Sequence, residues 1–167
     1  MRQEEFEIFI TCVPGLEKEL LNEVQEFGFK NSKLISGGVQ IVGGWHDVWR
    51  ANFYLRGATR VLVRFASFRA THLALLDKLS HKLNWKNLLQ HKKSFRVETV
   101  CRKSKIYHSG AASQRISKAI SDKIDAKEDP NSDIIIKTRI TSDICTISLD
   151  SSGESLHKRG YKIATGK

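Results

Sequence analysis

Two hydrophobic periods alternate along the first 68 residues. Apolar residues at every second position predict half-buried strands, and apolar residues three or four apart predict amphipathic helices. The first helical segment turns its glutamates to the polar face, and Gly37-Gly38 predicts a tight hairpin turn. In order, the pattern predicts a strand at 5–12, a helix at 16–27, strands at 33–36 and 39–42, a helix at 45–55 and a strand at 59–68.

This order of strand, helix, strand, strand, helix and strand predicts a ferredoxin-like βαββαβ unit. In its second helix Trp45 and Trp49 recur at helical spacing together with Val48 and Phe53. Such aromatic residues could form a platform for stacking bases, but at this spacing they are more often core residues. We therefore expect both tryptophans to pack in the core.

The remaining residues predict an α/β unit, so the fold class is α+β with domains at 1–68 and 69–167. Leucines at helical spacing follow Thr71, and residues 85–89 predict one further helical turn. The pattern then predicts a strand from Ser94, a basic loop, a helix at 110–127, a hairpin of strands at 134–140 and 144–149, and an edge strand within 153–162.

Charge is distributed unevenly along the chain, whose net charge is +10. Residues 1–55 carry net −3, residues 56–118 carry net +13, and residues 119–167 are neutral overall. A stretch that is almost free of acids favours a polyanionic partner over a merely solvated surface. A membrane surface is the competing polyanion, but the helix near 71–89 spaces its apolar residues like a core stripe. Nucleic acid is therefore the favoured partner.

No apolar run is long enough to cross a bilayer, and the N-terminus lacks a signal-peptide pattern, so a cytoplasmic location is expected. Cys12, Cys101 and Cys145 lie singly within predicted strands. We expect them to be small core residues rather than a metal or redox site. The histidines show no metal-ligand spacing, so neither a metal nor a cofactor is expected in this chain.

The strand from Ser94 opens into a basic loop, and Ser109 is placed to cap the helix that follows. The free N–H groups of that helix would face the loop, which is a phosphate-binding arrangement. Arginine offers bidentate contact to phosphate, lysine a point charge, and aromatic rings stack on unpaired bases. The candidate RNA-binding residues are Lys92, Lys93, Arg102, Lys103, Lys105, Tyr107, His108, Arg115, Lys118, Lys158, Arg159 and Lys162.

Two of these residues have alternative interpretations. Tyr107 could pack against the edge of the strand instead of stacking on a base. His108 could form an acid–base pair of ribonuclease type with His157, since histidine titrates near neutral pH. Nothing in the sequence orients such a pair, so we assign no catalytic residue.

Three phrases in this order resemble the N-terminal part of bacterial THUMP-containing RNA methyltransferases: LRGATRVLV at 55–63, CRKSKIYH at 101–108 and LHKRGY at 156–161. In that family a ferredoxin-like unit precedes a THUMP domain, and a Rossmann-type catalytic domain follows that methylates guanine N2 in ribosomal or transfer RNA. The resemblance covers nearly the whole chain. It implies that residues 69–165 form a THUMP domain, a general RNA-binding module.

Catalytic members of that family continue into a Gly-rich S-adenosylmethionine loop and an Asn/Asp-Pro-Pro-Tyr/Phe motif, and this chain has neither. The resemblance therefore implies S-adenosylmethionine only for a catalytic domain outside this chain, which should not methylate RNA alone. Two functions stay open. The chain is either the substrate-recognition region of an rRNA or tRNA guanine-N2 methyltransferase, or a free-standing adaptor that presents RNA to a separate modifying enzyme.

Overall fold

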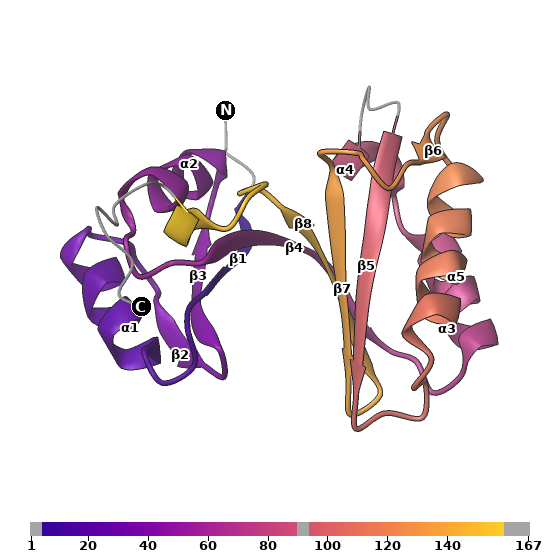
Figure 1. Ribbon diagram of the computed structural model, residues 1–167, viewed down its shortest axis with the longest axis horizontal. Coiled ribbons are helices and arrows are strands. Elements are labelled where there is room, and N and C mark those ends of the chain that lie inside the picture. Colours follow the sequence, from indigo (N-terminus) through magenta and orange to yellow (C-terminus); the bar gives the residue numbers. More distant parts are fainter. Residues whose placement is uncertain (1–4, 90–93, 159–167) are drawn as a thin grey trace, which may run out of the picture. The chain divides into compact units, whose positions relative to one another are not determined.

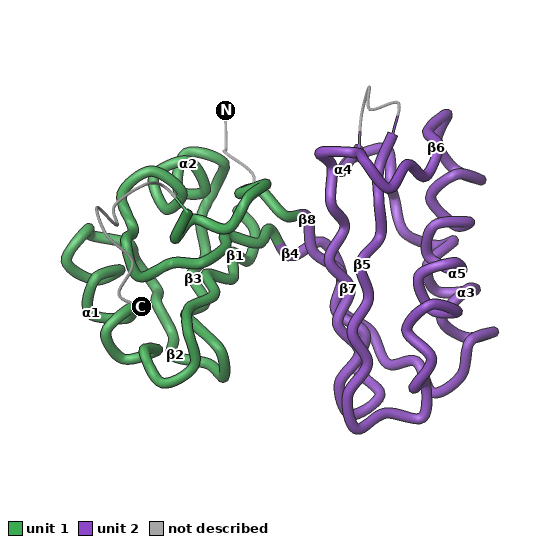
Figure 2. The backbone as a smooth tube through the Cα atoms, viewed as in Figure 1, with its two compact units in different colours: residues 1–63, 150–167 green, residues 64–149 purple. Residues whose placement is uncertain are grey.

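The computed structural model describes residues 5–89 and 94–158 (Figure 1). The chain divides into two compact units (Figure 2). The first unit contains residues 1–63 and 150–167, and the second contains residues 64–149. Within the described residues, every helix is too short or too polar to cross a membrane.

This division differs from the boundary predicted between residues 68 and 69. Strand β4 (Arg60–Arg69) begins in the first unit and ends in the second, and the chain returns to the first unit at the end of strand β8 (Ile144–Asp150). After β8, the Ser151 amide donates to the Val61 carbonyl at 3.1 Å. Hydrophobic periods identify strands but not their neighbours, so they could not reveal this return.

The first unit confirms the predicted ferredoxin-like arrangement. Its strands lie in the order β2-β3-β1-β4, and β1 pairs antiparallel with both β3 and β4. A side chain at Gly38 would place its Cβ 2.0 Å from the Ile10 carbonyl oxygen, so only glycine fits this turn. The elements are β1 (Phe6–Thr11), α1 (Glu17–Glu26), β2 (Lys33–Ile35), β3 (Gly38–Gly43), α2 (Trp45–Tyr54) and β4.

The assignment of the two tryptophans of α2 to the core is wrong. Trp45 is 46% exposed, Trp49 is 65% exposed and Phe53 is 74% exposed. Helix α2 instead buries Val48 and Ala51. The buried stripe therefore includes a small alanine, and the large aromatic residues occupy the adjoining stripe. The prediction gave more weight to the larger side chains and therefore selected the wrong stripe as the buried one.

We expect the substitution Trp49→Phe to remove most of the tryptophan fluorescence that acrylamide can quench, because Trp49 is the most exposed of the three indole rings. The matched substitution Trp85→Phe should leave the quenchable fraction intact, since Trp85 is fully buried. Equal quenching of the two variants would contradict this description of α2.

The second unit packs its helices on one face of a mixed sheet (Figure 1). Its strands lie in the order β8-β7-β5-β6, with β4 next to β8. Strand β5 pairs parallel with β7 and with β6, and β7 pairs antiparallel with β8. The remaining elements are α3 (Leu73–Lys82), α4 (Trp85–Leu89), β5 (Ser94–Arg102), α5 (Ser109–Ser121), β6 (Lys127–Glu128) and β7 (Ile135–Thr141).

The core of this unit lies between the helices and the sheet. Most of the large apolar side chains at the contact between the helices and the sheet are fully buried. The alternation of the strands and the helical spacing therefore confirm the predicted α/β character of this part of the chain. The largest contributors are Leu76, Trp85, Phe95, Ile116, Ile120, Ile136 and Ile140.

Two predicted elements differ from the structure. The helix expected at 110–127 ends at Ser121, whose hydroxyl donates to the Ala126 carbonyl at 3.1 Å as the chain turns into β6. The edge strand expected within 153–162 is also wrong where it can be compared, because Leu156–Lys158 form a 3₁₀ helix. The rest of that segment lies outside the described residues.

Candidate nucleic-acid interface

The basic loop begins where two parallel strands end together. The register of β5 and β7 places Arg102 beside Thr141, the last residue of each strand. In α/β sheets, ligands are commonly bound beyond the carboxyl ends of parallel strands. The loop at 103–108 therefore occupies a position at which binding groups can project past the sheet.

The turn between β7 and β8 supports the backbone of this loop. The Asp143 carboxylate accepts from the Lys105 amide at 2.8 Å, and the Asp143 amide donates to the Ser104 hydroxyl at 3.0 Å. The Ser104 hydroxyl in turn donates to the Arg102 carbonyl at 2.9 Å. Ile106 is buried in the core and fixes the far end of the loop.

The cationic side chains of the loop stay in solvent while its backbone is held. Arg102, Lys103 and Lys105 are all exposed, and Lys103 adopts a φ of +47°. That left-handed backbone turns the chain at Lys103, just after the end of β5. The three cations are thus presented on a supported loop, which lowers the entropy lost when they contact phosphate.

Replacing Asp143 by glycine tests this support. Asp143 has a φ of +65°, which glycine adopts without strain, so Asp143→Gly removes only the carboxylate. Loss of an acid beside the loop would strengthen RNA binding if charge alone mattered. We expect about fivefold weaker binding instead, because the loop loses one supporting hydrogen bond.

Fluorescence anisotropy with a labelled RNA provides the measurement. Asp133→Gly is the matched control, since Asp133 is an exposed acid of the same unit. Tighter binding by Asp143→Gly than by this control would show that the carboxylate acts only through its charge.

Helix α5 begins at the end of the loop. Its N-cap is His108, whose Nδ1 accepts from the Ala111 amide at 3.4 Å, so the cap predicted at Ser109 is wrong. The His108 side chain satisfies one of the free N–H groups that we expected to bind phosphate. Tyr107 is 83% exposed, which contradicts packing against the strand edge and leaves its ring available for stacking.

The other candidate residues are distributed between the two units. Arg115 and Lys118 are exposed and lie three residues apart on α5, so they share one face of that helix. Lys158 is exposed but belongs to the first unit, as does His157. Outside the described residues lie Lys92, Lys93, Arg159 and Lys162.

The sequence prediction missed a set of cations within the strands of the second unit. Arg96 lies on β5, and Lys137 and Arg139 lie on β7. They occur singly, separated from other cations by apolar residues or by Thr138, so no basic cluster is visible in the sequence. Cations at alternate positions of a predicted strand lie on the same face of the sheet, and this was the signal that could have identified them.

His81 links α3 to α5 on the helical layer of this unit. Its Nε2 lies 3.1 Å from Asp122 Oδ2, and its Nδ1 lies 2.8 Å from the Asp77 carbonyl oxygen. Both partners are acceptors, so the doubly protonated ring satisfies both contacts. The hydrogen bond to Asp122, followed by that to Asp77, raises the pKa of His81 above its usual 6.5.

This pKa shift predicts a pH-dependent contribution to stability. Because the folded-state pKa is raised, the contribution is fully present below the unfolded-state pKa and is lost as pH rises through the folded-state pKa. We expect the Tm to fall between pH 6 and pH 8, and His81→Gln should reduce that fall. Identical Tm profiles for the two proteins over this range would exclude the linkage.

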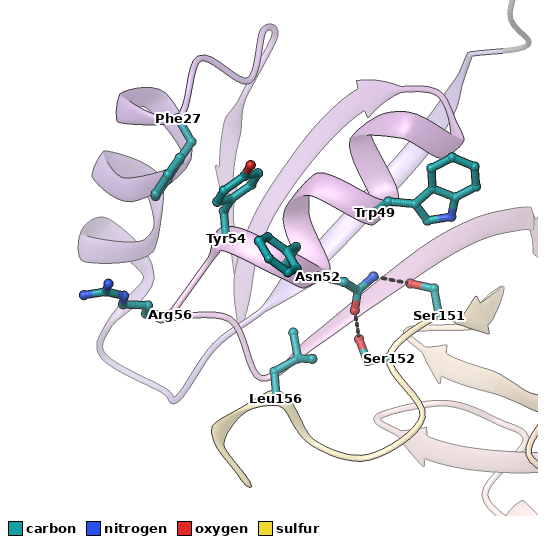
Figure 3. Close-up of a pocket in the computed structure, with 9 residues that line it drawn as sticks. Phe27, Trp49, Asn52, Tyr54, Arg56, Ser151, Ser152 and Leu156 are labelled. Atoms are coloured by element: carbon teal, nitrogen blue, oxygen red, sulfur yellow. Dashed lines mark hydrogen bonds between the residues drawn. The ribbon is translucent and has the colours of Figure 1, made fainter. Parts of the chain in front are cut away.

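The first unit contains a pocket of about 800 Å³, which is lined by residues of α2 and of the segment after β8 (Figure 3). The Asn52 amide donates to the Ser151 hydroxyl at 3.0 Å and accepts from the Ser152 hydroxyl at 2.7 Å. The Phe27 and Tyr54 rings stack at the rim with centroids 5.4 Å apart. These contacts explain why the segment after β8 belongs to the first unit.

The loop after β5 does not fit an S-adenosylmethionine site. The loop after β5 carries lysine, tyrosine and histidine where an S-adenosylmethionine loop is rich in glycine. No group of three metal-binding side chains occurs in 5–89 or 94–158. Burial raises the pKa of all three cysteine thiols, that of Cys145 to about 12, which disfavours a reactive thiolate. No step of a reaction is therefore assigned to this chain.

Comparison with known proteins identifies both units. The family model for the RlmL ferredoxin-like domain matches residues 7–62, and the model for the THUMP domain matches residues 70–150. Ribosomal RNA large subunit methyltransferase K/L of Pseudomonas aeruginosa is 29% identical over 96% of this chain, which covers 23% of that protein. The same enzyme of Syntrophotalea carbinolica is 30% identical over 92% of this chain, again covering 23% of the relative.

Solved structures give the same result for the fold. A crystal structure from Listeria monocytogenes, described as a predicted N6-adenine-specific DNA methylase, has a TM-score of 0.84 and 29% identity over 98% of this chain and 45% of its own. A possible methylase from Clostridium difficile has a TM-score of 0.86 and 26% identity with the same coverage. The chain spans less than half the length of these relatives. It belongs to the proteins in which an RlmL-type ferredoxin-like domain is followed by a THUMP domain, the arrangement that the three sequence phrases predicted.

Proposed function

We propose that this chain is the RNA-binding, substrate-recognition region of an S-adenosylmethionine-dependent rRNA or tRNA guanine-N2 methyltransferase. The observation that carries the proposal is the succession of the two family matches over residues 7–150, shared with relatives named as ribosomal RNA methyltransferases. The supported basic loop of the second unit supplies side chains suited to phosphate. The cofactor and the catalytic domain would belong to the remainder of such an enzyme.

In this role the second unit holds the sugar-phosphate chain and does not read the bases. Contacts from lysine and arginine to phosphate fix the register of an RNA without specifying its sequence. The target guanine would lie at a distance, in the catalytic pocket, and would have to be unpaired or flipped to reach it. We expect this activity in the cytoplasm, where ribosomal and transfer RNA are modified.

Binding and methyl transfer can be measured separately on residues 1–167. Labelled rRNA fragments and tRNA should bind at low salt, and incubation with radiolabelled S-adenosylmethionine should transfer no methyl group to either RNA. The RNA that binds more tightly is the better candidate substrate. Absence of binding to both RNAs at low salt would overturn the proposal.

The alternative function is a free-standing adaptor that presents RNA to a separate modifying enzyme. The codons after Lys167 in the gene distinguish the two functions. A reading frame that continues to an Asn/Asp-Pro-Pro-Tyr/Phe motif supports the enzyme. A stop codon at this point supports the adaptor.

A further inference from the structure

Among the described residues of the second unit, the helices cover one face of the sheet and leave the other without a helix. Strand alternation shows which side chains lie on that second face. On β5, Phe95 and Val97 point into the core beneath the helices, so Arg96 and Glu98 lie on the other face. On β7, Ile136 and Ile140 are core residues, which places Lys137 and Arg139 on the helix-free face as well. We call this face the open sheet face; its residues on the two strands include Arg96, Glu98, Val100, Arg102, Lys137, Arg139 and Thr141.

The strand register brings these side chains together. Glu98 lies beside Lys137, Val100 lies beside Arg139, and Arg102 lies beside Thr141. Neighbouring strands in a sheet are about 4.8 Å apart, so each pair is in direct lateral contact. Four cations and one acid therefore occupy this face of two adjacent strands, and the next strand, β8, places the neutral Thr146 opposite Arg139 and the buried Ser148 opposite Lys137.

The single acid orients the cations without cancelling them. Glu98 forms ion pairs with Lys137 and with Arg96, whose Nε lies 3.6 Å from Glu98 Oε1. Arg139 is exposed, and its Nε donates to the Thr141 hydroxyl at 3.3 Å. The face keeps a positive excess, with its guanidinium and ammonium groups held in place by neighbours on the sheet.

The part of the face nearest the basic loop is accessible. Val100 is 50% exposed and Ile144, the residue of β8 opposite Thr141, is 43% exposed. Exposed apolar side chains between cations suit the ribose and base faces of an unpaired strand, whose phosphates the cations contact. Arg102 ends β5 and begins the basic loop, so the two surfaces are continuous.

We infer that the open sheet face binds the backbone of a single-stranded RNA segment that continues from the basic loop. This inference rests on the proposed function and adds a surface to it. The RNA would extend from the basic loop along the open sheet face, where Arg139 and then Lys137 contact successive phosphates. An acidic protein segment is the competing partner for such a face, and the test below includes it.

The test compares the double variant Lys137→Gln, Arg139→Gln with the double variant Lys78→Gln, Lys123→Gln. The control removes two exposed cations of the same unit that lie outside the open sheet face. Loss of two single-strand phosphate contacts should weaken binding of a labelled 20-nucleotide RNA by about 25-fold at 0.1 M salt, and should flatten the salt slope by about 1.4. The control should change affinity less than threefold.

A second variant guards against misfolding. Arg139→Glu alters one exposed side chain, so its circular dichroism and Tm should match those of the unaltered protein. Its affinity for the RNA should fall at least as far as that of the double variant, because it adds repulsion to the lost contact.

Each outcome bears on a different claim. RNA binding that the Lys137 and Arg139 variants leave unchanged, or reduce no more than the control does, overturns the inference and spares the proposed function. Weaker binding of polyglutamate with unchanged binding of RNA would assign the face to an acidic protein and also overturn it. Failure of the unaltered protein to bind RNA at low salt overturns the proposed function itself.

Discussion

Replacing Arg102, Lys103 and Lys105 together by alanine is expected to weaken RNA binding about 100-fold at 0.1 M salt. All three side chains are exposed on a loop whose backbone is held by Ser104 and Asp143, so the substitution removes charge and leaves the fold in place. Because the variant neutralises fewer phosphates, fewer counterions are released when it binds RNA. The slope of log affinity against log salt should therefore flatten by about 2 to 3. Fluorescence anisotropy titrations at several salt concentrations measure both quantities.

The loss should be similar for unrelated RNA sequences, because the loop contacts backbone and not base edges. A matched control replaces three exposed lysines of the same unit, Lys78, Lys82 and Lys123, by alanine. An unchanged slope in the loop variant, or an equal change in the control, would remove the loop from the interface.

Replacing Trp85 by alanine is expected to lower the free energy of unfolding of the second unit by about 3 to 5 kcal/mol. The Trp85 side chain is fully buried, its ring lies 5.0 Å from that of Phe65, and its Nε1 donates to the Ser80 carbonyl at 2.8 Å. The substitution leaves a cavity and removes one of the two hydrogen bonds that the Ser80 carbonyl accepts, the other coming from the Leu83 amide at 3.3 Å. Urea unfolding followed by far-ultraviolet circular dichroism gives the change in free energy.

Trp49→Ala provides the comparison, since this side chain of the first unit is 65% exposed. Its cost should stay below about 1 kcal/mol, as is usual for surface substitutions. Comparable losses in the two variants would mean that the burial assigned to the tryptophans is incorrect.

The sequence was sufficient to predict the order of the elements up to the helix α5 and the hairpin of β7 and β8, because each of these has its own hydrophobic period, but it missed the short strand β6. The hairpin at Gly37-Gly38 and the turn at Ser142-Asp143 were equally local, since a two-residue connection leaves few geometries. The basic loop was also identified correctly as exposed, because its three cations interrupt a buried strand. These features depend only on residues close together in the chain.

The errors and omissions involve residues far apart in the chain or too small to dominate a pattern. Ala51, not Trp49, faces the core of the first unit, because the space beneath α2 accepts a small side chain there. The contact between His81 of α3 and Asp122 at the end of α5 joins residues that are 41 positions apart in the sequence. Cations on β5 and β7 share the open sheet face only because these two strands are paired neighbours. The sequence alone does not show which strands pair.

The most direct test of the account is the salt dependence of RNA binding by the unaltered chain. If the second unit neutralises roughly four to six phosphates, log affinity should fall against log salt with a slope of about −3 to −5. A slope near zero would contradict the claim that the cations of this unit hold the sugar-phosphate chain.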